Sequence, residues 1–202
     1  MEKGIAFPTK VSILALIVSF TLLYSMYYRN QFAPMINQFE GELILKELPE
    51  FEIQKISDDS LITKKDLINS EGRLTLVHFW GTWCGPCEAE LPPLIALAKR
   101  FQKTEIQFLL IAVQDTKEKV VKYFKRFGDL PPNMILAIDH KTDSMNKFGT
   151  VKVPESYVFN PAGTNLSKFI GPQDWDQDRY YDRLRFYHNS SKGVITRPVE
   201  TH

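Results

Sequence analysis

The feature that most constrains the fold of this 202-residue chain is a pair of mostly apolar runs of strand length, Leu74–Trp80 and Ile106–Val113. Neither run alternates strictly, which is typical of strands buried on both faces of a parallel sheet. Between them, residues 84–101 carry apolar side chains at helical spacing. Strand, helix and strand in this order predict a parallel βαβ unit.

Weaker patterns on both sides extend this unit into one α/β domain. Pro92 and Pro93 should kink the helix over 84–101, because neither ring nitrogen can donate to a carbonyl one turn back. The other expected elements are a strand over 51–56, a helical turn over 63–68, a helix over 116–127, a strand over 134–138, a short helix over 142–148, a hairpin of strands over 156–159 and 166–170, and a closing helix over 174–187.

The N-terminal part of the chain has a different character. Residues 1–10 form a short head with Lys3 and Lys10, and residues 11–28 carry no charge. A cleavable signal peptide has an apolar stretch of about 7–15 residues followed by small residues, whereas this run is longer and leads into Tyr27 and Tyr28. About 17–25 apolar residues cross a bilayer. We therefore expect an uncleaved transmembrane signal-anchor over 11–28, with a cleaved signal or a buried helix as alternatives.

This interpretation fixes the expected organisation and location. Residues 29–48 would be a linker, 49–188 the folded domain and 189–202 a loose tail. The lysines of the head favour an N-terminus inside the cell. The domain would then lie on the periplasmic or extracytoplasmic side of the cytoplasmic membrane. A formal net charge of +1 gives no bias toward nucleic acid.

The only two cysteines of the chain, Cys84 and Cys87, lie in the run Trp83-Cys84-Gly85-Pro86-Cys87. A disulfide between them would close a loop of a few residues, which stabilises a fold little. The pair therefore indicates chemistry. Thiol exchange needs one accessible thiolate and a second sulfur close enough to resolve the mixed disulfide.

The expected position of the pair at the start of a helix meets both needs. The helix N-terminus would lower the pKa of Cys84, and Cys87, one turn further, would be more buried and act second. Pro86 has the backbone angle of a first helical turn. Gly85 lets a partner chain approach closely.

Three other classes of protein carry comparable cysteines. A zinc site would need another Cys/His pair at ligand spacing, and the remaining histidines, such as His140 and His188, are scattered. Copper chaperones of the exported class usually have three residues between their cysteines. A peroxiredoxin needs Thr or Ser three residues before its nucleophile, where this chain has Gly81. We expect no metal and no cofactor, with copper binding as the alternative from another class.

Two segments resemble a known family. Residues 77–92, VHFWGTWCGPCEAELP, are similar to the active-site segment of the thioredoxin superfamily, most closely its membrane-anchored TlpA/ResA-like (DsbE/CcmG-like) branch. Residues 152–159, KVPESYVF, resemble the cis-proline loop of that family. The resemblance covers about residues 48–187. It implies the thioredoxin fold, a three-layer α/β/α arrangement with a central mixed sheet.

The same resemblance implies a function. Cys84 would be the nucleophile and Cys87 the resolving thiol of a redox-active disulfide. Pro154 would be the cis-proline packed against that disulfide, and the Val153 backbone would pair with an extended substrate. The branch includes reductases of cytochrome c maturation. It implies a protein-disulfide reductase supplied by a membrane electron donor of the DsbD/CcdA type, with a disulfide oxidase as the alternative.

Four further residues flank the cysteines. Glu90 matches the acidic residue of ResA-like proteins that can raise thiol pKa values and relay protons, although a solvated helix position is the alternative. His78 stands where thioredoxin has a buried Asp and TlpA-like proteins often have Asn. It could shuttle the proton of Cys87 or be a neutral core residue. Trp80 is expected to pack near the dithiol and Trp83 to lie at its rim. Trp83, Gly85 and Pro86 are expected to contact the substrate.

Overall fold

The computed structural model describes residues 15–27, 45–68 and 72–191. The chain divides into two units, residues 1–44 and 45–202. In the first unit, residues 15–27 form a helix. Among the described residues, no helix has both the length and the apolar character needed to cross a bilayer. The expected head, residues 11–14 and 28 of the expected anchor, residues 29–44 of the linker and residues 192–202 lie outside the described part of the chain.

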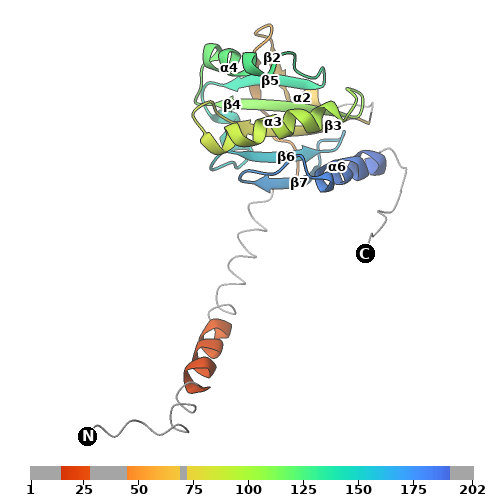
Figure 1. Ribbon diagram of the computed structural model, residues 1–202. Coiled ribbons are helices and arrows are strands. Elements are labelled where there is room, and N and C mark those ends of the chain that lie inside the picture. The colour runs from red at the N-terminus through yellow and green to blue at the C-terminus, as the bar shows by residue number, and fades with distance from the viewer. Residues whose placement is uncertain (1–14, 28–44, 69–71, 192–202) are drawn as a thin grey trace, which may run out of the picture. The chain divides into compact units, whose positions relative to one another are not determined.

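The second unit is built on a mixed seven-stranded sheet in the order β2-β1-β5-β4-β3-β6-β7 (Figure 1). The three central strands are parallel, and the outer pairs on both sides run antiparallel to their neighbours. The strands are β1 (Glu52–Lys55), β2 (Leu61–Thr63), β3 (Leu74–Trp80), β4 (Ile106–Val113), β5 (Met134–Asp139), β6 (Glu155–Phe159) and β7 (Asn165–Ile170).

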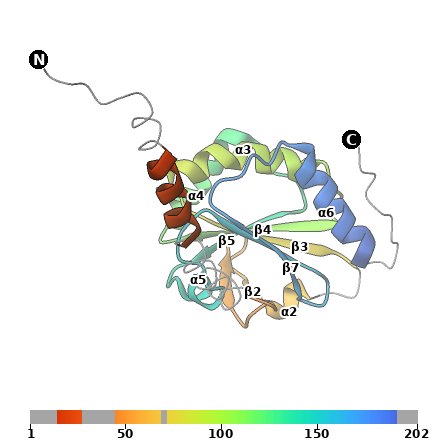
Figure 2. The same ribbon diagram turned by 90° about the horizontal axis from the view of Figure 1, so that it is seen from below.

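Helices cover both faces of this sheet. On one face lie α3 (Gly85–Lys99), α4 (Lys117–Phe124) with the 3-10 turn η1 (Lys125–Phe127), and α6 (Asp178–Ser191). On the other lie α2 (Lys64–Leu67) and α5 (Asp143–Lys147) (Figure 2). Each face buries its own apolar cluster. The result is the three-layer architecture with a mixed sheet that the sequence resemblance implies.

The side chains of β3 alternate between the two clusters. Leu76 and Trp80 belong to the cluster under α3, whereas Val77 and Phe79 belong to the opposite one. By the two-residue period of a strand, His78 points to the face of α3. A titratable ring therefore lies inside the layer that carries the cysteines.

Most expected elements are confirmed, and three details differ. Helix α6 continues to Ser191, four residues beyond the expected end, so residues 189–191 of the expected loose tail are helical. Strand β2 was not expected, because three residues are too few to show a period. The closing helix begins at Asp178, four residues later than expected, because Asp174 to Gln177 form a turn in which Gln177 N donates to Asp174 O. Trp175 is fully buried in that turn. In the sequence it has the spacing of an apolar helix residue, which explains the earlier expected start. Helix α3 continues through Pro92 and Pro93 to Lys99.

The ordered domain also begins before residue 49. Leu48 is 1% exposed, and its backbone N–H donates to Gly163 O at 2.7 Å. Glu47 forms a β-bridge with Thr164 in the β6–β7 turn. The described end of the expected linker, residues 45–48, therefore packs on the domain. Its burial could not be foreseen because its partner residues lie more than a hundred positions further along the chain.

Candidate active site

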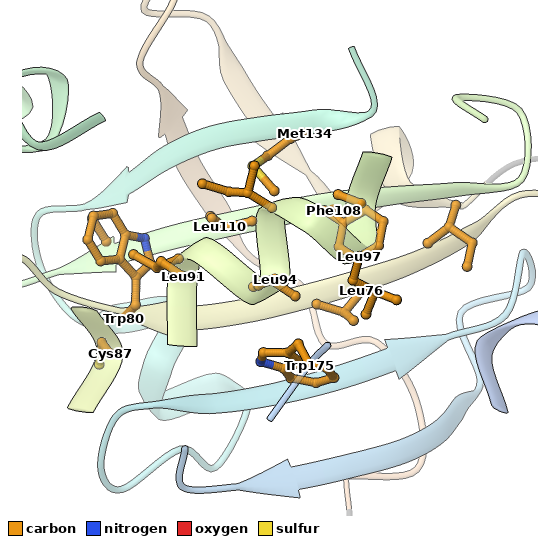
Figure 3. Close-up of a cluster of buried hydrophobic side chains, with 14 of the residues drawn as sticks. Leu76, Trp80, Cys87, Leu91, Leu94, Leu97, Phe108, Leu110, Met134 and Trp175 are labelled. Atoms are coloured by element: carbon orange, nitrogen blue, oxygen red, sulfur yellow. The ribbon is translucent and has the colours of Figure 1, made fainter. Parts of the chain in front are cut away.

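Cys84 and Cys87 are joined by a disulfide, with their Cα atoms 5.3 Å apart. Cys84 is the N-cap of α3, and its sulfur accepts a hydrogen bond of 3.2 Å from the Cys87 backbone N–H. Cys84 is 6% exposed and Cys87 is fully buried at the end of the apolar cluster where Trp80 lies (Figure 3). The sulfur at the helix N-terminus is therefore the one that an incoming partner can reach.

The loop between β3 and α3 is fixed by the carboxylate that follows β4. Asp115 accepts hydrogen bonds from the backbone N–H of Thr82 at 2.7 Å and from its hydroxyl at 3.0 Å. The Trp83 indole N–H donates to Val113 O at 3.0 Å. Sequence reasoning missed Asp115. The available signal was its place two residues after a parallel strand, since carboxyl ends of parallel strands meet at one edge of the sheet.

Glycines flank Trp83 for two different reasons. A Cβ on Gly81 would lie 2.6 Å from Trp83 Nε1, so a larger residue there would require the indole to move. A Cβ on Gly85 would meet nothing within 4 Å, and Gly85 and Pro86 are both exposed. Trp83 is 56% exposed. Trp83 is therefore exposed beside Cys84, as expected of a rim residue.

The loop before β6 lies against the same sulfur. The Val153–Pro154 peptide bond is cis, as the resemblance implies. Val153 O is 4.0 Å from Cys84 Sγ, and Gly171 N donates to Pro154 O at 2.9 Å. Pro154 is buried and Val153 is half-buried. The structure therefore brings residues 77–92 and residues 152–159 into contact, although Cys84 and Val153 are 69 residues apart in the chain.

Glu90 is 3% exposed, so the alternative of a solvated helix residue is wrong. Its Oε2 accepts the Gln173 backbone N–H at 2.7 Å. Burial raises the pKa of Glu90 to about 7, although the Gln173 N–H and the Trp175 indole act in the opposite direction. Glu88, by contrast, is exposed and forms an ion pair of 2.9 Å with Arg126.

A cavity of about 270 Å³ leads from the surface to Glu90. Its walls come from α3, from the segment before α6 and from the start of α6, and include Asp174, Arg179 and Tyr180. Glu90 is therefore buried among apolar residues on one side and close to solvent on the other. A larger cavity, of about 360 Å³, lies at the amino ends of the parallel strands and contains none of the expected site residues.

His78 is fully buried and contacts Glu90. Its Nδ1 lies 2.8 Å from Ser156 Oγ, and its Nε2 lies 3.3 Å from Glu90 Oε1. The second approach is a close electrostatic contact whose angles are not those of a hydrogen bond. Burial lowers the pKa of His78 to about 3, so the ring is neutral at physiological pH.

The structure therefore joins two sets of expected residues. Cys84 lies beside Val153, and Cys87 lies one helical turn from Glu90, which contacts His78. Ser156 and Gln173 were missed, because their hydrogen bonds join segments that only the fold brings together. Within the described ranges, no group of three or more His, Cys, Asp or Glu side chains is arranged to hold a metal ion.

Comparison with known proteins relates this site to one family. Residues 44–164 match the AhpC/TSA family. The thiol-disulfide oxidoreductase ResA of Bacillus cereus is 29% identical over 132 residues, which are 65% of this chain and 72% of the relative. The thiol:disulfide interchange protein HelX of Rhodobacter capsulatus is 29% identical over 136 residues, which are 67% and 73% of the two chains.

Solved structures share the fold at lower identity. A thiol:disulfide interchange protein of the thioredoxin family from Chlorobium tepidum TLS aligns with a TM-score of 0.54 at 23% identity, covering 69% of this chain and 92% of that one. StoA from Bacillus subtilis aligns with a TM-score of 0.52 at 20% identity, covering 71% and 98%. These similarities show the thioredoxin fold.

The burial of Glu90 predicts a pH-dependent stability of the oxidised protein. Below about pH 4.5 the carboxyl is protonated in both the folded and the unfolded chain. Between about 4.5 and 7 the folded chain binds more protons, so its free energy of unfolding falls as the pH rises. Relative to wild type, Glu90→Gln should become more stable by up to about 3 kcal/mol from pH 4 to pH 8.

Urea unfolding of the oxidised proteins at several pH values measures this difference. Glu88→Gln is the matched control on the same helix. Because it removes only an exposed ion pair, it should change the free energy of unfolding by less than about 1 kcal/mol. A difference between Glu90→Gln and wild type that does not vary with pH would contradict the prediction.

Proposed function

Since the chain belongs to the AhpC/TSA family, we propose that it is a thiol-disulfide oxidoreductase that exchanges disulfides with proteins through Cys84 and Cys87. The observation that carries the proposal is the disulfide at the N-terminus of α3, with one sulfur near the surface and the other buried. The names of the relatives ResA and HelX describe the same chemistry.

In the reducing direction the reaction has two exchange steps. The Cys84 thiolate attacks one sulfur of the substrate disulfide, and the other substrate sulfur leaves as a thiolate that takes up a proton. Cys87 then loses its proton and attacks Cys84 Sγ. This attack breaks the mixed disulfide, releases the second substrate thiolate and forms the Cys84–Cys87 disulfide. One dithiol and one disulfide enter the reaction, and one of each leaves it.

The residues around Cys84 suit a polypeptide substrate. The exposed backbone at Gly85 leaves room for a second chain. Val153, whose carbonyl lies 4.0 Å from Cys84 Sγ, would pair through its backbone with an extended substrate segment beside Pro154. The exposed indole of Trp83 and the ring of Pro86 would contact the substrate on the other side. Main-chain pairing of this kind tolerates different substrate sequences.

Glu90 would accept the proton of Cys87 in the second step. The two residues are three apart on α3, where side chains are neighbours with about 5–6 Å between Cβ atoms. A carboxyl with a pKa of about 7 can both take and release a proton near neutral pH. The cavity beside Asp174 and Arg179 offers that proton a path to solvent.

The exchange mechanism predicts different outcomes for the two cysteines. Cys84→Ser should reduce a small disulfide at a rate at least about a thousandfold below wild type, because the nucleophile is lost. Cys87→Ser should instead accumulate a mixed disulfide through Cys84, since the resolving thiol is absent. Stopped-flow absorbance measures the first and intact-mass spectrometry the second. Wild-type turnover by Cys84→Ser would refute the proposed function.

We infer that the physiological direction is reduction, as cytochrome c maturation requires, with electrons from a membrane donor of the DsbD/CcdA type. The acidic Glu90 beside the dithiol and the resemblance of residues 77–92 to the TlpA/ResA-like branch, which includes reductases, support this direction. Disulfide oxidation is the competing direction, because the same exchange steps run both ways.

The reduction potential of the Cys84/Cys87 couple separates the two directions. The potential is measured by equilibrating the protein with glutathione or dithiothreitol buffers. A reductant should have a potential near that of thioredoxin, about −270 mV, and an oxidant one of about −120 mV. We expect the first value. A potential near the second would reverse the assignment of direction while leaving the exchange chemistry intact.

We also propose that the domain works outside the cytoplasmic membrane, held there by residues 11–28. The support is the sequence: an uncharged run preceded by Lys3 and Lys10 and followed by Arg29. The same location would allow contact with a membrane electron donor.

Anchoring predicts that the full-length chain keeps its N-terminus and stays with the membrane after carbonate extraction. Mass spectrometry of the mature protein measures the first and fractionation the second. Replacing Leu16 and Leu23 by Lys should release the chain, because charges within a span are costly. A mature N-terminus beyond residue 28 would show a cleaved signal instead.

A further inference from the structure

A continuous line of polar groups crosses the apolar layer under α3. It runs from Ser156 on β6 through His78 on β3 to Glu90 on α3, and from there to the backbone of Gln173. Ser156, His78 and Glu90 are 2%, 0% and 3% exposed. Strand pairing sets its first contact, because His78 and Ser156 are opposite each other in the β3–β6 register. The mechanism above uses only Glu90 from this line.

The hydrogen bond of Ser156 determines which ring nitrogen of His78 carries the proton. Its buried hydroxyl has a proton to donate, and the structure places His78 Nδ1 at 2.8 Å from it. If the hydroxyl donates to Nδ1, the neutral ring carries its proton on Nε2. Nε2–H then faces Glu90 Oε1 at 3.3 Å. In the opposite tautomer, the Ser156 proton would have no acceptor at Nδ1, and the Nε2 lone pair would lie 3.3 Å from a carboxylate oxygen, which is costly.

We propose that His78 is a positioning residue for thiol exchange: Ser156 orients its ring so that Nε2–H faces Glu90 and stabilises the ionised carboxyl that receives the proton of Cys87. This role rests on the proposed function, since it acts through Glu90. The role also explains why a polar imidazole ring, rather than an apolar side chain, is buried at position 78. Ser156 supplies the orientation that decides which ring nitrogen carries the proton.

The other charged groups around Glu90 do not take the place of His78 beside the carboxyl. Asp174 and Arg179, one of each sign, line the cavity on its solvent side together with Tyr180. Arg179 lies over the Tyr180 ring, and its Nη2 donates to the Tyr180 hydroxyl. On α3 itself, Cys87 lies three residues before Glu90 and is held in the disulfide. On the sheet side, His78 is the ring whose nitrogen faces the carboxyl.

Direct observation of the tautomer tests the first step in the wild-type protein. The oxidised full-length chain, labelled with ¹⁵N-histidine and held in detergent micelles, should show His78 protonated on Nε2 in long-range ¹⁵N–¹H spectra at pH 8. The signal is assigned by its loss in His78→Gln. A ring protonated on Nδ1 would overturn the proposal.

The titration of Glu90 tests the second step. In the oxidised chain labelled with ¹³Cδ-glutamate, the midpoint of Glu90 should rise by about one to two pH units in His78→Asn, because the N–H dipole at 3.3 Å from the carboxylate is lost. His78→Gln is the matched variant, since a glutamine amide reaches the place of Nε2 whereas an asparagine amide reaches only that of Nδ1. Its midpoint should stay within about half a unit of wild type.

The remaining outcomes are also decisive. Equal midpoints in wild type and His78→Asn, or equal shifts in the Asn and Gln variants, would overturn the proposal and indicate a packing role. If the His78 variants do not fold, Ser156→Ala, which keeps the ring, should still raise the midpoint, and an unchanged midpoint would overturn the proposal. No cysteine reacts in these measurements, so their failure is separate from a failure of the Cys84→Ser test.

Discussion

The parallel pairing of β3 with β4 is the constraint on which the rest of the structure depends. The two strands pair in register from Leu74 and Ile106 to Trp80 and Ala112. Their carboxyl ends therefore meet at one edge, where the chain leaves β3 toward Cys84 and leaves β4 toward Asp115. The carboxylate of Asp115 then holds Thr82. Because of this pairing, α3 starts where its first N–H groups face the sulfur of Cys84.

The second consequence of this pairing is the burial of two titratable side chains. His78 and Glu90 lie in a layer of mostly apolar side chains, where a charged group is costly. Burial lowers the pKa of the histidine and raises that of the glutamate. Both groups therefore favour their neutral forms. The hydrogen bond from Gln173 and the Trp175 indole reduce the cost of ionising Glu90 without removing it.

The sequence predicts this fold well where the signal is local. The bounds of β3 and β4 follow from their apolar runs, and those of α3 from helical spacing after a capping position. The cysteine pair is visible because nothing else in the chain resembles it. Contacts that depend on pairing across the fold are not visible: Ser156 opposite His78, Gln173 over Glu90, and Leu48 on the β6–β7 turn. These residue types are common at any position of a chain, and only the folded structure shows which residue each of them contacts.

The electrostatics of the site connect these buried groups to the direction of electron flow. A dithiol couple is a strong oxidant when its reduced form is stabilised, as by groups that favour a thiolate. The N-terminus of α3 acts in that sense on Cys84. An ionised Glu90, one turn from Cys87, acts in the opposite sense, because a negative charge disfavours a second one nearby. If His78 keeps Glu90 ionised, it also makes the reduced form less stable. The buried histidine would then favour a reductant, which is the direction that the proposed function requires.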